Sequence, residues 1–192
     1  MKLLRTIRLD PSDGFVFERA ATAGEWAVPG GFEFGATDPR ALTGRQKQAF
    51  RAGFLGLGSF GWSTLVIAVE ATPDERAVAV RALAGHLLSA HGAPDMAVAH
   101  AAAEEEIAFA AGLAEHPPQT LIALHRTFDA DGTIREQFRT LRPADAREAA
   151  QMPCSAGAFA IVEDESGEPD SGDTLDLVDL AGVTTGEGPG RP

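Results

Sequence analysis

The chain has 192 residues, a formal net charge of −12 and a hydrophobic content of 44%. This length suits one hydrophobic core with an appendage and excludes two ordinary domains. An acidic chain repels phosphate backbones, so we expect no nucleic acid partner. No apolar run reaches the roughly 18–20 residues that span a bilayer, and the first residues lack signal-peptide features, so we expect no membrane association. The single cysteine, Cys154, rules out an intrachain disulfide and predicts a cytoplasmic protein.

The first residues predict a β-hairpin. Residues 2–9 alternate apolar and polar side chains with the period of two that is typical of a strand. Turn-forming residues, D-P-S-D-G, follow at 10–14. Residues 15–20 then predict a second strand, with Phe15 and Phe17 on one face.

Glycines punctuate the next part of the chain. Residues 25–34 predict short extended pieces around a Pro-Gly-Gly turn, and residues 38–54 predict one or two short helical turns. Residues 56–61 read G-L-G-S-F-G, which matches the dinucleotide-binding pattern. That pattern needs a strand before it and a helix after it, whereas residues 45–51 are helix-like and residues 62–70 read as a buried strand. We interpret these glycines as sites of close backbone approach, with phosphate binding as the alternative.

Two helices are predicted in the centre of the chain. Residues 72–75, T-P-D-E, form a capping box with proline at the first helical position, and His91-Gly92 end this helix. A second helix begins at residues 94–95 and runs to the prolines at 117–118.

The second helix carries three consecutive carboxylates, Glu104 to Glu106. Successive helical residues differ by about 100°, so the three cannot face one site. We expect at least one to be a solvated surface charge and one to pair with Arg126 or Arg135.

Strands return after the helices. Residues 120–128 and 133–141 predict a second hairpin around the turn at 129–132, D-A-D-G. Residues 143–192 carry eleven Asp and Glu against two Arg, a composition that predicts an acidic and largely disordered tail.

The order of elements, ββ(β)-α-β-α-α-β-β, predicts an α+β fold. Strands at both ends with helices between them are typical of a mainly antiparallel sheet with two central helices packed on one face. We expect a single domain over residues 1–142, followed by the tail.

Histidines supply the candidate metal ligands. His100 and Glu104 lie four apart on one helical face, within reach of one ion. A zinc or iron site needs more ligands than these two, and His86 and His91, five apart, do not share a helical face well. Cys154 has no evident base near it, and we find no catalytic constellation, so we expect no catalytic residue and no cofactor.

Two further groups of side chains predict binding surfaces. The first is a pocket between the helices and the sheet, lined by aromatic residues and one histidine: Trp26, Phe60, Trp62 and His125. The second is a positive sheet edge formed by arginines. These protect the edge or dock an acidic partner or the chain's own tail: they are Arg5, Arg8, Arg126, Arg135, Arg139 and Arg142.

Four strings carry a resemblance to a known family: K-L-L-R-T-I-R-L-D at 2–10, E-W-A-V-P-G at 25–30, F-G-W-S-T-L-V at 60–66 and A-E-E-E-I-A-F-A at 103–110. Together they resemble a family of short bacterial proteins known only as a domain of unknown function, over roughly residues 2–142. Members of that family lie beside genes for molybdenum-dependent, formate-dehydrogenase-like oxidoreductases and a biotin/lipoate-ligase-like protein. The resemblance implies accessory service to a redox-enzyme system and supplies no catalytic residues.

These observations predict a non-catalytic accessory or assembly protein of a bacterial redox-enzyme system. Its expected partner is another protein, such as a molybdenum-dependent oxidoreductase or its maturation machinery, bound through the sheet edge or the tail. The alternative is a small-molecule-binding protein or small enzyme that uses the aromatic pocket.

Overall fold

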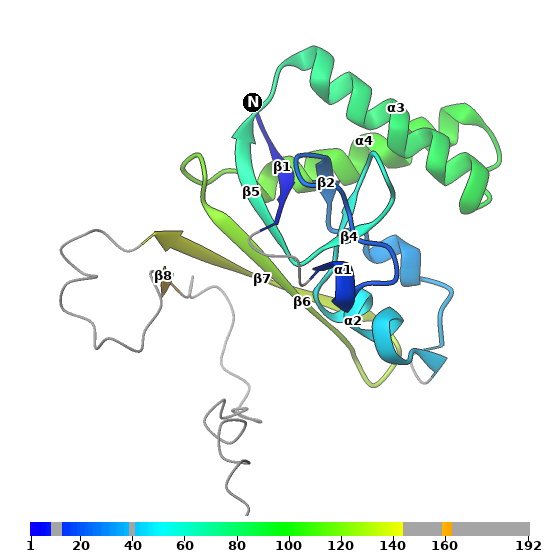
Figure 1. Cartoon of the computed structure of the whole chain (residues 1–192). Coiled ribbons are helices and arrows are strands. Elements are labelled where there is room, and N and C mark those ends of the chain that lie inside the picture. Colours follow the sequence, from blue (N-terminus) through cyan, green and yellow to red (C-terminus); the bar gives the residue numbers. More distant parts are fainter. Residues whose placement is uncertain (9–12, 39–40, 144–158, 163–192) are drawn as a thin grey trace, which may run out of the picture.

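A computed structural model describes residues 1–8, 13–38, 41–143 and 159–162. Its centre is an eight-stranded antiparallel sheet with the order β4-β3-β2-β1-β5-β6-β7-β8 (Figure 1). The fold is α+β, as the sequence predicts. The strands are β1 (Lys2–Ile7), β2 (Trp26–Val28), β3 (Phe54–Gly56), β4 (Trp62–Ser63), β5 (Leu65–Glu70), β6 (Leu121–Phe128), β7 (Ile134–Pro143) and β8 (Phe159–Val162).

The predicted N-terminal hairpin is wrong in its second strand. β1 pairs instead with β2 and β5, with Leu4 opposite Ala27 and Ala68. Residues 13–16 instead form a single helical turn, α1 (Asp13–Val16), and the Asp13 carboxylate accepts a hydrogen bond from Thr64 Oγ1 at 2.7 Å. This distant contact overrides the local strand pattern. Phe17 is buried, but Phe15 is 74% exposed, so the two rings do not share a face.

The two central helices are confirmed. The first, α3 (Pro73–Ala90), has the predicted capping box: Thr72 Oγ1 accepts from the backbone N–H of Glu75, and Glu75 accepts from that of Thr72. The second, α4 (Met96–Leu113), is capped by Asp95. The helices lie side by side, and α4 packs against β1 and β2 (Figure 1). Small buried side chains at their contact let them approach closely: Ala79, Ala84, Ala99 and Ala103.

A second, smaller core lies beneath the short elements. The helix α2 (Gly44–Ala52) packs against β6, and the 3-10 turn η1 (Gly31–Phe34) contributes the buried Phe34 to this core. Phe50 of α2 stacks on Phe128 of β6, with ring centroids 4.2 Å apart. Phe34 contacts the same Phe50 ring edge-on at 5.2 Å. Offset and edge-on pairs of this kind add to the stability that burial provides.

The glycine-rich segment joins two short strands. A strand follows it as predicted, divided into β4 and β5, but β3 also precedes it, and the sequence did not indicate that strand. The interpretation as close backbone approach is confirmed: a Cβ on Gly61 would lie 2.6 Å from the carbonyl of Ala20. A Cβ on Gly56 would lie 2.6 Å from the carboxylate of Glu25. Only glycine fits these two positions without a shift of neighbouring atoms.

The C-terminal hairpin is confirmed, with Phe128 of β6 opposite Ile134 of β7. The strand β8 then pairs with β7, so the sheet continues past residue 142, where the sequence predicts the domain to end. The rest of the predicted tail, with Cys154 in it, lies outside the described residues. Among the helices of the described chain, none is both long enough and apolar enough to cross a membrane.

Candidate functional site

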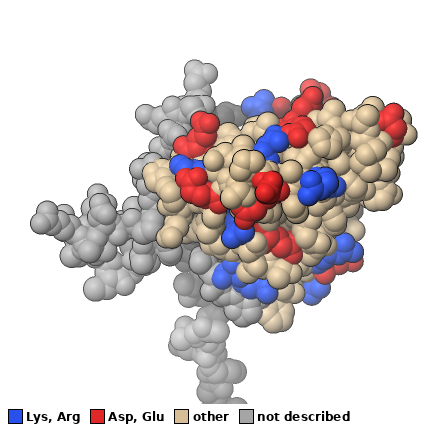
Figure 2. Space-filling view, turned by 90° about the horizontal axis from the view of Figure 1, so that it is seen from above, with Lys and Arg blue, Asp and Glu red and all other residues tan. Residues whose placement is uncertain are grey.

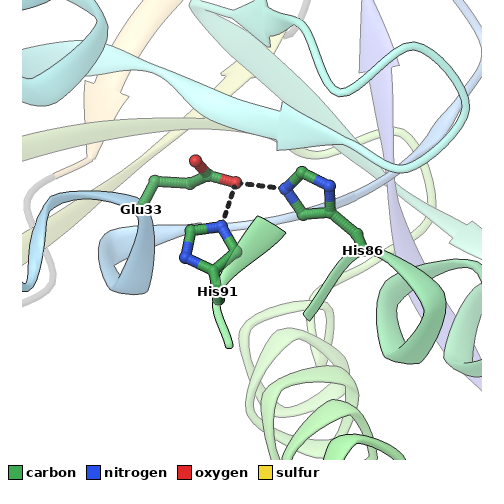
Figure 3. A group of neighbouring side chains, drawn as sticks. All are labelled: Glu33, His86 and His91. Atoms are coloured by element: carbon green, nitrogen blue, oxygen red, sulfur yellow. Dashed lines mark hydrogen bonds and ion pairs between the residues drawn. The ribbon is translucent and has the colours of Figure 1, made fainter. Parts of the chain in front are cut away.

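Three side chains converge at the end of α3. The Glu33 carboxylate oxygen Oε1 lies 2.6 Å from His86 Nε2 and 3.1 Å from His91 Nε2 (Figure 3). One ligand atom from each residue lies within 4.8 Å of the others. In the part of the chain that the structure describes, this is the one group of three such side chains placed to share an ion.

The end of α3 brings the two histidines together. Residues five apart on a continuous helix differ by about 140° around the axis, which is why the sequence did not pair them. His91, however, is the C-cap, with φ −112° and ψ 8°, and the chain turns away at Gly92 with φ +67°. The imidazole centroids are therefore only 5.1 Å apart. The expectation that His86 and His91 point in different directions was wrong because α3 ends between them.

Glu33 reaches the histidines through the Pro-Gly-Gly turn. Gly30 has φ +74°, a left-handed conformation that favours glycine, and it begins η1. Glu33 follows within η1, and its carboxylate contacts the two histidines at the end of α3. The sequence predicts this turn but does not indicate Glu33, because a single acidic residue in a turn carries no ligand pattern of its own.

A buried arginine supports the Pro-Gly-Gly turn through hydrogen bonds. Arg126 on β6 is 1% exposed, and its guanidinium donates to the carbonyls of Pro29, Phe50 and Gly53 and to Glu136 Oε1. The Arg126–Glu136 pair satisfies the charge, and the three carbonyls use most of the remaining donors. Arg126 is therefore a core residue, and its predicted place in an exposed docking patch was wrong.

Glu106 of α4 forms a further hydrogen bond to the Pro-Gly-Gly turn. Its Oε1 accepts from the backbone N–H of Gly30 at 3.2 Å. Burial raises the pKa of Glu106, the Gly30 hydrogen bond opposes this rise, and the negative charge of Glu136 adds to it. Of the three consecutive carboxylates, Glu104 pairs with Arg76 and Glu105 is exposed. Glu106 thus lies near Arg126, but the direct ion pair of Arg126 is with Glu136.

Aromatic rings flank both histidines. Phe60 stacks on His86 with centroids 3.9 Å apart and ring planes 10° from parallel. Phe32 meets His91 edge-on at 5.3 Å. The side chains of Glu33, His86 and His91 keep 22%, 16% and 26% of their surface exposed, so the centre is reachable from solvent. This arrangement can hold a divalent cation with three protein ligands and leave a coordination position for water or another ligand.

The glycine-rich loop beside this centre already holds an anion of the protein. Glu25 Oε2 accepts from the N–H groups of Gly58 and Ser59, at 2.9 and 2.8 Å, and from Ser59 Oγ. Burial raises the pKa of Glu25, but the hydrogen bonds from Ser59 and Thr22 outweigh it, so the pKa is lowered. Because a carboxylate uses the two loop amides, they are not free for the phosphate of the alternative interpretation.

The predicted metal ligands lie elsewhere. His100 is exposed on α4, and Glu104 forms an ion pair with Arg76 of α3. Both side chains line a groove of about 530 Å³ between the two helices. Among the described residues no third ligand lies beside them, so the structure favours the Glu33 centre for a metal.

The four residues of the predicted pocket have different neighbours. The Arg5 guanidinium lies 4.2 Å from the ring centroid of Trp26, and Trp62 packs against Phe34. His125 lies on β6, where burial lowers its pKa and the charges of Arg51 and Arg139 lower it further. Of the four, Phe60 alone contacts the Glu33 centre, through His86.

The remaining arginines of the predicted patch are dispersed. Arg8 donates to the carbonyl of Ala21, and Arg135 pairs with Asp129. Arg139 is exposed on β7. Basic and acidic side chains are interspersed over the face that Figure 2 shows. The side chain of Arg142 lies outside the described residues.

Comparisons with known proteins give one family. The model of a family of unknown function, DUF6505, matches residues 1–155, which include every residue of the Glu33 centre and its supports. Neither the curated proteins nor the solved structures contain a match. The matched range covers most of the chain and extends past the residues 2–142 that carried the resemblance. The chain therefore belongs to the DUF6505 family.

Proposed function

We propose that the protein binds a divalent transition-metal ion, such as Zn²⁺, through Glu33, His86 and His91. The observation that carries this proposal is the approach of one carboxylate oxygen to two imidazole nitrogens, at 2.6 and 3.1 Å. Two histidines and one carboxylate are the ligand set of several catalytic zinc sites and of non-haem iron sites.

The spacing of the ligand atoms suits a metal. Tetrahedral bonds of about 2.0–2.2 Å place neighbouring ligand atoms about 3.3–3.6 Å apart. The Glu33–His91 distance of 3.1 Å is slightly shorter than this range. The Glu33–His86 distance of 2.6 Å has to increase by about 1 Å, which side-chain rotation of Glu33 can supply.

The proposed site is open and not closed. A structural zinc site uses four protein ligands, whereas this one offers three and keeps part of each side chain exposed. A bound ion would therefore carry water or an external oxygen or nitrogen ligand. This supports a role in which the metal is presented to a small molecule or to another protein.

Metal content and calorimetry test the proposal. Purified full-length protein is titrated with Zn²⁺, and Co²⁺ is added as a spectroscopic probe of the ligand set. We expect one ion per chain in the wild type and at least a hundredfold weaker binding in Glu33→Gln and His86→Ala. The matched control is His100→Ala, an exposed histidine of α4, which should bind like the wild type. Wild-type protein that binds no ion, or ligand variants that bind as tightly as the control, would overturn the proposal.

A second candidate function is that of an accessory protein acting through protein contacts. The helix α4 exposes two large apolar side chains, Val98 and Phe109, which are 48% and 47% exposed. Residues eleven apart lie within about 20° on a helix, so both side chains face the same way. Exposed apolar patches of this kind mark protein interaction sites. The resemblance adds the proposal that the partner is a molybdenum-dependent oxidoreductase or its maturation machinery.

Co-purification with that enzyme system tests the second candidate. A Val98→Asp and Phe109→Asp double variant should lose the oxidoreductase or its maturation proteins from a pull-down that the wild type retains. The matched control is His100→Asp, which adds the same charge at an exposed position on another face of α4 and so controls for changes in solubility. Retention of neither protein class by the wild type would rule this candidate out.

A further inference from the structure

We infer that the glycine-rich loop at residues 56–61 sets the orientation of the His86 imidazole, with Phe60 as the positioning residue and Glu25 as the anchor of the loop. This inference rests on the proposed metal site, because it concerns one of its ligands. It gives the G-L-G-S-F-G motif a role that is neither phosphate binding nor simple close packing.

The anchor is a carboxylate enclosed by backbone and hydroxyl donors. One oxygen of Glu25 accepts from Gly58, from the Ser59 amide and from the Ser59 hydroxyl, at 2.9, 2.8 and 3.1 Å. The other oxygen accepts from the N–H of Thr22 at 2.9 Å. Charge-assisted bonds of this kind are stronger than neutral ones, so Glu25 fixes the loop to the segment before β2.

Hydrogen bonds within the loop close it, and Gly61 packs tightly against the backbone of Ala20. The N–H of Gly56 donates to the carbonyl of Gly61 at 2.8 Å, and the N–H of Phe60 donates to the carbonyl of Gly56 at 3.0 Å. A Cβ on Gly61 would collide with the carbonyl of Ala20, which shows how little room the loop has. The loop therefore cannot shift without breaking several of these contacts.

Phe60 adopts an unfavourable backbone conformation within this loop. Its φ is +50°, a left-handed value that a bulky side chain rarely takes. Such strain persists only where surrounding contacts determine it, and it concentrates at functional sites. The consequence of this conformation is that the Phe60 ring faces α3 and stacks on His86.

The stack restrains the ligand ring. With centroids 3.9 Å apart and planes 10° from parallel, the Phe60 ring covers one face of the His86 imidazole. Rotation of the imidazole about its Cβ–Cγ bond would drive its edge into the phenyl ring. His86 Nε2 is thereby kept pointing at Glu33 Oε1, at 2.6 Å. Groups that orient a metal ligand in this way typically change metal affinity by 10–100-fold.

The test combines metal affinity with the state of His86 in metal-free protein. The variants are Phe60→Ala, Phe60→Leu and Glu25→Gln, with Phe109→Ala as the matched control because it removes another phenylalanine that touches neither the loop nor His86. We expect Zn²⁺ affinity to fall about tenfold in Phe60→Ala and by a smaller factor in Glu25→Gln. The control should keep wild-type affinity. Phe60→Leu, which keeps an apolar side chain but no flat face, should resemble Phe60→Ala.

Carbon-13 relaxation of the imidazole rings separates positioning from a general loss of structure. In the metal-free wild type we expect the His86 ring to be rigid, and we expect ring motion of larger amplitude in Phe60→Ala and in Glu25→Gln. His100, on α4, should be unchanged in every variant. If Phe60→Ala does not fold, Glu25→Gln decides the same question with the ring retained.

Each outcome bears on one claim. A wild type that binds no Zn²⁺, together with a His86 ring that becomes mobile in the loop variants, overturns the metal proposal and keeps the positioning role of Phe60. Unchanged Zn²⁺ affinity and unchanged His86 ring mobility in all three loop variants overturn the positioning role, whatever the wild type binds.

Discussion

Replacing Arg126 by methionine should destabilise the protein more than any single surface change. The guanidinium is buried and donates to Glu136 and to the carbonyls of Pro29, Phe50 and Gly53. Its loss leaves one carboxylate without its counter-charge and three carbonyls without a donor. Breaking a buried ion pair costs about 3–5 kcal/mol, and an unsatisfied buried acceptor costs about 1–3 kcal/mol. Because water can enter and satisfy some of these groups, we expect a loss of about 5 kcal/mol in the free energy of unfolding.

Urea unfolding of the full-length chain, followed by circular dichroism at pH 7, measures this loss. Arg139→Met on the neighbouring strand β7 is the control: Arg139 is exposed, and its replacement should change stability by less than about 0.5 kcal/mol. Arg126→Lys keeps the charge but not the fork of donors, so it should fall between the two. If Arg126→Met proves so unstable that it is unfolded without urea, Arg126→Lys supplies the measurement. A cost below about 1 kcal/mol for both Arg126 variants would refute the role of Arg126 as the support of the Pro-Gly-Gly turn.

Three further outcomes are expected. Gly61→Ala should destabilise the protein because its Cβ would lie 2.6 Å from the Ala20 carbonyl, whereas Gly85→Ala, in open space within α3, should stabilise it by about 0.5–1 kcal/mol; thermal unfolding compares them. Glu106→Gln should raise stability at pH 8 but not at pH 3. Burial raises the pKa of Glu106 in the folded protein above its ordinary value, so the wild type loses stability as the pH rises from the ordinary pKa through the raised one, and pH-dependent urea unfolding measures the difference. Thr72→Ala should lower the free energy of unfolding by about 1 kcal/mol through the lost cap of α3, and equal stability of this variant and the wild type would contradict that role.

Local patterns in the sequence were sufficient for the helices and for the C-terminal hairpin. The capping box at Thr72 and the turn at residues 129–132 each act within a few residues, and the structure has both. The strand expected at residues 15–20 failed because its conformation depends on Asp13 reaching Thr64, about fifty positions away. No local pattern contains that contact.

The position of Arg126 could have been inferred from the strand pattern. Ile122, Leu124 and Arg126 alternate along β6 and therefore share a face, and the first two are buried. An arginine that continues an apolar alternation belongs with the core when carbonyls are available to receive it. Its positive charge instead suggested a solvent-exposed edge.

The metal centre could not be derived from spacing alone. His86 and His91 fall outside helical spacing because α3 ends between them, and Glu33 lies in another element. The one usable signal was the predicted end of α3 at His91, since residues beyond a helix end no longer follow its period. Recognising that Glu33 meets them required the path of the Pro-Gly-Gly turn, which Arg126 and Glu106 hold from a distance.

The central place of β1 in the sheet has a consequence for how the chain folds. The strand β1 is flanked by β2 and by β5, and its partners in β5 come about sixty positions later in the chain, as with Thr6 and Val66. During translation the side chains of Leu3 and Leu4, which are buried in the folded protein, therefore lack one neighbouring strand until β5, which ends at Glu70, has emerged. Such distant pairings slow folding relative to helical bundles and expose an apolar strand in the meantime. A nascent chain of this design depends on rapid completion, or on a chaperone, to avoid pairing its first strand with another molecule.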